Sequence, residues 1–116
     1  MRKIYEYDVF QLSHNLVIEM YKVTKTFPKE ELFNLISQMR RSSYSIPTNL
    51  VEGAGRSSGK EFGRFIDIAI GSCDEVRYQL FLSRDLGYIN EEKYKELDYK
   101  YEKVKMMLCK LISRIK

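Results

Sequence analysis

The residues most suggestive of chemistry lie in one short stretch, residues 54–60, which reads Ala-Gly-Arg-Ser-Ser-Gly-Lys. This stretch nearly matches the phosphate-binding loop of nucleotide hydrolases, in which a glycine-rich turn ends in Gly-Lys-Ser or Gly-Lys-Thr. Glu61 replaces the hydroxyl residue that would bind the metal ion, and a carboxylate there would repel phosphates. The stretch also follows a helical pattern rather than a buried strand. We therefore expect a helix-to-helix turn and no nucleotide-hydrolysing site.

The same turn gathers positive charge in Arg56, Lys60 and Arg64. Backbone amides at the start of a helix can hold a phosphate together with basic side chains. Arg40 and Arg41 form a second basic pair, and arginine can grip a phosphate through two parallel hydrogen bonds. The alternative is a solvated charged face, or salt bridges to nearby acids. Those acids are Glu52, Asp67, Asp74 and Glu75.

Polar residues also recur at helical spacing beside the apolar positions. They are Ser45, Asn49 and Glu52 in one segment, and Ser72, Glu75 and Gln79 in another. We interpret them as a structural polar network or a subunit contact, with Glu75 placed to meet Arg40 or Arg41. A metal-carboxylate centre is the alternative, but such centres use Glu-x-x-His pairs. His14 is the only histidine and has no acid three residues before it, so we expect neither a metal nor a cofactor.

The other reactive side chains do not form a catalytic set. No serine has a histidine and an acid arranged for nucleophilic attack, so we predict no catalytic residues. Cys73 and Cys109 both fall among apolar positions, which favours buried free thiols over a disulfide or a reactive pair.

Several tyrosines fall outside the strongest core positions. They are Tyr5, Tyr7, Tyr44, Tyr88 and Tyr99. Amphipathic rings of this kind suit subunit interfaces or base stacking. They can equally rest at the edge of a folded core with no partner at all.

The elements that must position these residues are four long helical segments. Their expected ranges are 8–27, 29–53, 59–86 and 90–116. The last is the clearest, because apolar residues recur in alternating steps of three and four, the pattern of a helix packed on other helices. These residues are Tyr94, Leu97, Tyr101, Val104, Leu108, Leu111 and Ile115. Short connections make sequential helices antiparallel, so we predict an all-α, up-down-up-down four-helix bundle.

Start and stop signals support these segments. Asp8 is a suitable N-cap for the first helix, and Pro28 can open the second. Pro47 lies inside the second helix, where we expect a kink rather than an end because the apolar rhythm continues beyond it. Ser58 begins a capping box for the third helix, and Asn90 can cap the fourth.

Composition sets the outer bounds. At 116 residues, the chain is expected to form one domain spanning 1–116. A formal net charge of +4 permits an anionic partner but does not require one. No segment approaches the ~20 apolar residues of a membrane helix, and the N-terminus does not read as a signal peptide. We expect a cytoplasmic protein with no membrane partner.

The combined motifs resemble a known family. They are Gln38-Met39-Arg40-Arg41, Ser45-Ile46-Pro47, Asn49, Glu52-Gly53, Gly55-Arg56, Lys60-Glu61-Phe62, Arg64-Phe65, Ala69, Gly71-Ser72, Glu75, Gln79-Leu80 and Asp85-Leu86-Gly87-Tyr88-Ile89. The chain resembles, over residues 5–116, the bacterial four-helix bundle proteins encoded by intervening sequences in 23S ribosomal RNA genes. That family includes the accessory variability proteins of diversity-generating retroelements. Phe10 stands where the family usually has tryptophan, and Ala54 where it often has an aromatic residue.

The resemblance implies an antiparallel four-helix bundle that assembles as a homopentamer and has no catalytic activity. In the retroelement branch, such a pentamer binds a reverse transcriptase and nucleic acid through its basic surface. Carried to this chain, the resemblance makes the five basic residues named above the binding candidates. It makes Asn49, Glu52, Ser72, Glu75 and Gln79 the polar framework.

We therefore predict a non-enzymatic, oligomeric protein that associates with nucleic acid, RNA in particular. The alternative is a protein-interaction scaffold that binds a partner such as a reverse transcriptase or a ribosome-associated factor. An enzyme is the third hypothesis, and the missing catalytic groups argue against it.

Overall fold

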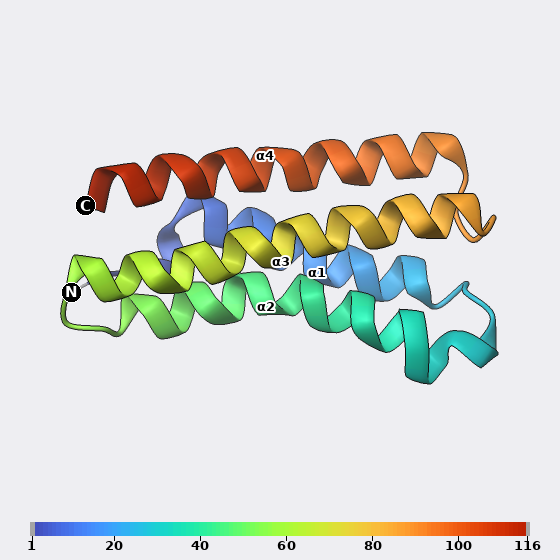
Figure 1. Cartoon of the computed structure of the whole chain (residues 1–116), viewed down its shortest axis with the longest axis horizontal. Coiled ribbons are helices and arrows are strands. Elements are labelled where there is room, and N and C mark those ends of the chain that lie inside the picture. Colours follow the sequence, from blue (N-terminus) through green and yellow to red (C-terminus); the bar gives the residue numbers. More distant parts are fainter. Residues whose placement is uncertain (1, 116) are drawn as a thin grey trace.

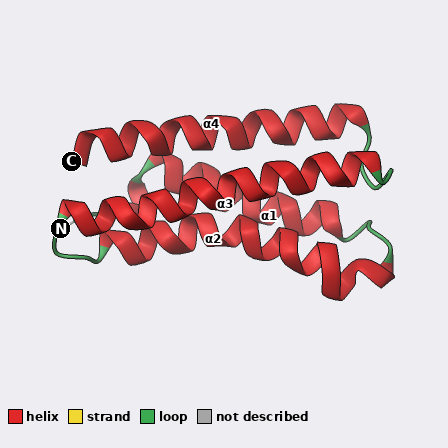
Figure 2. Cartoon of the chain, viewed as in Figure 1, coloured by secondary structure: helices red, strands yellow, loops and turns green. Residues whose placement is uncertain are grey.

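A computed structural model describes residues 2–115, and their main elements are four antiparallel helices (Figure 1). The helices are α1 (Asp8–Thr24), α2 (Ser37–Ala54), α3 (Gly59–Asp85) and α4 (Glu91–Ile115), with a short turn of helix, η1 (Ile4–Glu6), before α1. Between residues 2 and 115 only helices and loops occur, with no strand (Figure 2). The predicted all-α, up-down-up-down bundle is confirmed. Across these residues, no helix has the length and hydropathy needed to cross a membrane.

The core is one continuous cluster to which all four helices contribute. Met20 of α1, Leu50 of α2, Ile66 of α3 and Leu108 of α4 are fully buried within it. The predicted seam of α4 is buried at its centre, from Leu97 to Leu108, and only half-buried at its two ends. Those ends have fewer neighbours, because each lies at an end of the bundle.

The second segment differs from the continuous helix that we expected over 29–53. It opens with a short 3₁₀ turn, η2 (Lys29–Glu31), and a π-helical turn, η3 (Leu32–Ile36), and α2 begins only at Ser37. Asn34 leaves helical geometry, with φ −121° and ψ −106°. Asparagine offers its own side chain as a hydrogen-bonding alternative to the helix. Phe33 in this turn is exposed. As predicted, α2 does not end at Pro47.

Other helix ends agree with their local chemistry. Ser58 Oγ accepts a hydrogen bond from the Glu61 amide at 3.1 Å, and Asn90 Oδ1 accepts one from the Lys93 amide at 2.7 Å. Asp8 is the first residue of α1 rather than its cap, because Tyr7 is the extended residue before the helix. The first helix also ends earlier than expected, at Thr24.

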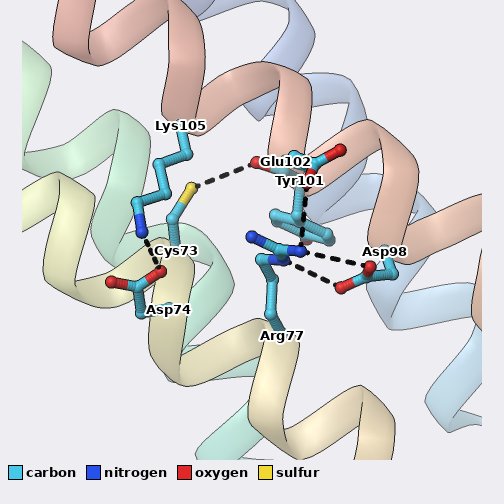
Figure 3. Close-up of polar contacts among 7 residues, drawn as sticks. All are labelled: Cys73, Asp74, Arg77, Asp98, Tyr101, Glu102 and Lys105. Carbon is cyan, nitrogen blue, oxygen red and sulfur yellow. Dashed lines mark hydrogen bonds and ion pairs between the residues drawn. The ribbon is translucent and has the colours of Figure 1, made fainter.

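The interface between α3 and α4 combines apolar packing with paired charges (Figure 3). Arg77 of α3 donates two hydrogen bonds to Asp98 of α4, with Nε to Oδ1 at 2.8 Å and Nη2 to Oδ2 at 3.3 Å. Lys105 of α4 donates to Asp74 Oδ1 at 2.8 Å. These two basic residues are therefore engaged in holding the helices together.

The opposite side of α3 packs closely on α2. A Cβ placed on Gly53 would lie 2.6 Å from Cβ of Phe65 and 2.9 Å from Cδ1 of Phe62. Only glycine allows this approach, since real Cβ atoms do not come so near to another carbon. The close contact sets the turn of residues 55–58, between α2 and α3, on which the basic residues lie.

Candidate nucleic-acid interface

Three of the predicted basic residues lie together at the α2–α3 turn. Arg56 follows the end of α2, while Lys60 and Arg64 stand four residues apart on α3 and so share a face of that helix. All three side chains are exposed. We call these three residues the end cluster. Within the described part of the chain, none of them takes part in an ion pair.

The N-terminal segment adds a basic residue, Arg2, to this region, which the sequence analysis did not identify. Arg2 Nη1 donates to the backbone oxygen of Arg56 at 2.8 Å, and the Arg2 guanidinium lies 4.6 Å from the centre of the Phe62 ring. The Arg56 guanidinium lies 4.8 Å from the centre of the Phe65 ring. A cavity of about 820 Å³ opens beside these groups. Its lining includes Arg2, Lys3, Tyr7, Val51 and Arg56.

The C-terminal end of α4 borders the same cluster. Lys60 and Arg64 line a groove of about 510 Å³ with Ile112 and Ile115, and one acid, Asp67, lies in it. Lys110 and Arg114 line a neighbouring groove of about 440 Å³. No acidic residue follows Glu102 in the chain. Both terminal segments therefore lie beside the end cluster, Arg2 at Arg56 and the end of α4 at Lys60 and Arg64. No local sequence pattern signals this tertiary arrangement.

Arg40 and Arg41, the second predicted basic pair, have different surroundings. The Arg40 side chain crosses to α1, where Nε donates to Thr24 Oγ1 at 2.9 Å and the guanidinium lies 4.5 Å from the centre of the Tyr21 ring. Arg41 is exposed. At about 1.5 Å of rise per residue, it stands roughly 20 Å along α2 from the end cluster. The five predicted basic residues therefore fall into three groups. Three form the end cluster, Arg41 stands apart, and Arg40 joins α2 to α1.

The predicted polar framework is only partly connected. Ser45 Oγ and Ser72 Oγ lie 2.9 Å apart and join α2 to α3, and Asn49 Nδ2 donates to the Ser45 oxygens. Gln79 Nε2 donates to Glu75 at 3.4 Å. The expected contact of Glu75 with Arg40 or Arg41 is not among the ion pairs of the described residues, where Arg40 turns toward α1 and Glu75 accepts from Gln79. Glu52 is exposed and makes no side-chain hydrogen bond with the other framework residues in the described part of the chain.

The cysteines occupy opposite environments. Cys73 is fully buried, and its Sγ donates to the backbone oxygen of Tyr101 at 3.7 Å. Burial, helped by the neighbouring Asp74 charge, raises the pKa of the Cys73 thiol to about 12. Cys109 is exposed, so its expected burial is wrong. It follows the buried Leu108, and one residue of helix turns a side chain by about 100°.

The off-core tyrosines also divide. Tyr88 donates its hydroxyl hydrogen to Glu31 Oε2 at 2.7 Å, and its ring lies against Phe27 with centroids 5.1 Å apart. These two contacts of Tyr88 join the connection between α1 and α2 to the turn between α3 and α4. Tyr5, Tyr44 and Tyr99 are exposed. Within residues 2–115, no group of three or more histidine, cysteine or acidic side chains is placed to hold a metal ion.

Comparison with known proteins places this arrangement in context. The family described as 23S rRNA-intervening sequence protein matches residues 5–110. A crystal structure from Bacteroides thetaiotaomicron, of a protein of unknown function from the S23 ribosomal protein family, is similar in fold. The two chains are 24% identical in sequence and superpose with a TM-score of 0.80. The alignment covers 90% of this chain and 97% of the other. No match was found among curated proteins.

Proposed function

This chain belongs to the 23S rRNA-intervening sequence protein family, and from that premise we propose that it is a non-enzymatic, oligomeric protein that binds RNA in the cytoplasm. The phosphate backbone of the RNA is held at the end cluster of Arg56, Lys60 and Arg64. The Arg2 guanidinium and the amides at the start of α3 add further donors. No cofactor takes part.

One observation carries this proposal: the end cluster is exposed and its charges are unpaired among the described residues. Basic residues that stabilise this fold are paired instead, since Arg77 and Lys105 each form an ion pair with an acid across the α3–α4 interface. Basic side chains without an acidic partner at the start of a helix suit an anionic ligand, because the N-terminal amides and the helix dipole also favour negative charge. Binding to phosphates needs no particular base sequence.

Self-association would strengthen a weak site. Five copies of a chain with a net charge of +4 would carry roughly +20, and repeated sites raise avidity without new contacts. We propose a homo-oligomer on this ground, with the pentamer that the family resemblance implies. Light scattering on the purified protein measures its mass directly.

The test is fluorescence anisotropy of nuclease-treated protein against labelled structured RNA and duplex DNA over a salt series. The key variant combines Arg56→Glu, Lys60→Glu and Arg64→Glu. We expect at least a tenfold loss of RNA affinity and a shallower salt dependence, since each lost phosphate contact lowers the log–log slope by ~0.7–0.9.

A matched control reverses three exposed bases at the other end of the bundle, Lys25, Lys29 and Lys95. It makes the same change in net charge. If both variants lose affinity equally, RNA responds to total charge and the end cluster is not the site. If the end-cluster variant folds normally and binds RNA as tightly as the parent, the proposal is wrong.

A protein scaffold is the second candidate, and the outer face of α3 favours it. Ile68 and Tyr78 are exposed there, and a Cβ on Gly71 between them would touch nothing within 4 Å. Exposed apolar side chains on an uncrowded helix face suit a protein partner. Capture from a native lysate after nuclease treatment, compared between the parent and Ile68→Glu, tests this candidate. A partner lost only by the variant supports it.

A further inference from the structure

A shallow aromatic groove runs between α1 and α2. It has a volume of about 240 Å³. Its lining residues are Tyr5, Phe10, His14, Val17, Tyr44, Pro47, Thr48 and Val51. The Tyr5 ring meets the Phe10 ring edge-on with centroids 4.8 Å apart, and the Phe10 and His14 rings are parallel at 6.1 Å. Tyr5 and Tyr44 are 64% and 44% exposed, so their faces are open to a ligand.

The helices on either side of this groove offer few negative charges. Glu19 of α1 turns to α4, where its carboxylate oxygens lie 3.9 Å from Lys93 Nζ and 3.3 Å from Lys100 Nζ. Asp8, at the start of α1, lines a different groove, beside Arg114. Glu52 is the only acid of α2, and it lies one turn beyond Thr48.

Positive charge stands at both ends of the groove. Arg41 precedes Tyr44 by three residues on α2, so the two side chains are neighbours on the helix surface. At the other end, Val51 lines both the groove and the larger cavity that contains Arg2, Lys3 and Arg56. A ligand that follows the groove therefore passes from one basic side chain, over exposed aromatic rings, to a group of basic side chains.

We infer that this groove binds a single-stranded segment of RNA, an inference that rests on the proposed function. The nucleobases stack on Tyr5, His14 and Tyr44, and the phosphates are held by Arg41 at one end and by Arg2, Lys3 and Arg56 at the other. Stacking platforms combined with a basic path are how proteins bind single strands with little sequence preference. A duplex would hide the faces of its bases from these rings.

The dimensions agree with a short strand. Arg41 and the end cluster are roughly 20 Å apart along α2 at ~1.5 Å per residue, enough for a few nucleotides. This is the lower end of the ~4–16 nucleotides that a single-strand-binding fold covers. The groove is smaller than the ~300–1,000 Å³ of pockets that enclose small molecules. Its open, shallow form suits rings laid on a surface.

The experiment compares a short unstructured RNA with an RNA duplex of equal length by anisotropy. The variants are Tyr44→Ala and Tyr5→Ala/Tyr44→Ala, with Tyr5→Phe/Tyr44→Phe to keep the rings. Tyr99→Ala, on α4, is the matched control because Tyr99 is 67% exposed and lies outside the groove. We expect the double alanine variant to lose about 10- to 100-fold in single-strand affinity. Duplex affinity should change less than twofold, and the phenylalanine variant should bind like the parent.

Tyrosine emission gives a second readout, because the chain has nine tyrosines and no tryptophan. Stacked bases should quench part of this emission in the parent and less in the double alanine variant. Circular dichroism establishes that each variant is folded. Tyr44→Ala alone settles the matter if loss of Tyr5 disturbs Phe10.

The contrary results are distinct. If the end-cluster reversal abolishes RNA binding but the tyrosine variants bind single strands normally, the groove inference fails and the proposed function stands. If the parent binds no RNA at low salt, both fail. If the tyrosine variants change only the particle mass measured by light scattering, the groove is a contact between copies of the chain, and the inference is overturned.

Discussion

Cys73 and Cys109 lie on two helices that pack together, yet their chemistry should differ sharply. The thiolate is the reactive form of cysteine, and the raised pKa of Cys73, about 12, leaves almost none of it near neutral pH. At pH 8, a thiol reagent should modify one cysteine per folded chain rapidly and the second only after denaturant is added. Mass spectrometry should place the rapid label on Cys109. Two rapid labels would show that Cys73 is accessible.

Burial of ionisable groups also predicts the alkaline limit of the fold. Burial raises the pKa of both Cys73 and Tyr101 above the ordinary values of 9.0 and 10.0. The unfolded chain therefore releases these protons at lower pH than the native protein does. The free energy of unfolding should fall from about pH 9 upward, by as much as ~1.4 kcal/mol per pH unit for each proton. Urea unfolding at several pH values measures this slope.

Tyr101→Phe provides the control for the alkaline prediction. Phenylalanine keeps the ring in the core but cannot titrate, so the decline in stability above pH 10 should be shallower than in the parent. An identical slope would mean that other groups cause the alkaline loss.

Residue-level prediction from the sequence succeeded where the cause is local. The Ser58 cap is one example, because its partner amide is three residues away. Arg40 is the counterexample: its contacts, Tyr21 and Thr24, belong to another helix. Arg2 was missed for the same reason. The candidate site is largely tertiary, so sequence alone identified its bases but not how they are grouped.

At the scale of elements, the α2–α3 contact depends on one glycine. In Gly53→Ala, the new Cβ must push the Phe62 and Phe65 side chains away. Overpacking of this kind costs ~1–3 kcal/mol, more than the up to ~1 kcal/mol that alanine gains over glycine in a helix. We expect net destabilisation, measured by chemical denaturation.

Gly71→Ala is the matched control within α3. Nothing lies within 4 Å of a Cβ at this position, so only the helix preference remains, and the variant should gain about 0.5–1 kcal/mol. Equal effects of the two substitutions would show that helix propensity, not the close approach of α2 and α3, determines the outcome.

The elements were predictable where the apolar rhythm is regular. Along α3, apolar residues recur in steps of four and three, and all six are fully buried. They are Phe62, Ile66, Ala69, Cys73, Val76 and Leu80. The π-helical turn before α2 was not predicted, because one residue, Asn34, changes the register while the surrounding pattern still reads as helix. Periodicity reports the average geometry of a segment and does not detect a single inserted residue.

For the molecule as a whole, the continuous core predicts a single cooperative unfolding transition. Every helix contributes fully buried residues to the same cluster. Unfolding of one helix would therefore expose core side chains of the other three to water. Helix content from circular dichroism and tyrosine emission should therefore change at the same urea concentration. Separate midpoints would indicate a helix that unfolds on its own.

An even number of antiparallel helices returns the chain to the end where it began (Figure 1). Arg2 contacts the α2–α3 turn, and a Cβ on Gly59 would lie 2.6 Å from the Ile115 backbone oxygen. A purification tag fused to either end of this chain would therefore hang beside Arg56, Lys60 and Arg64. If the end cluster binds RNA as proposed, a protein immobilised by such a tag should capture less RNA, because the tag lies over the site. A label inserted at the exposed turn around Gly87, at the far end, would leave the end cluster open.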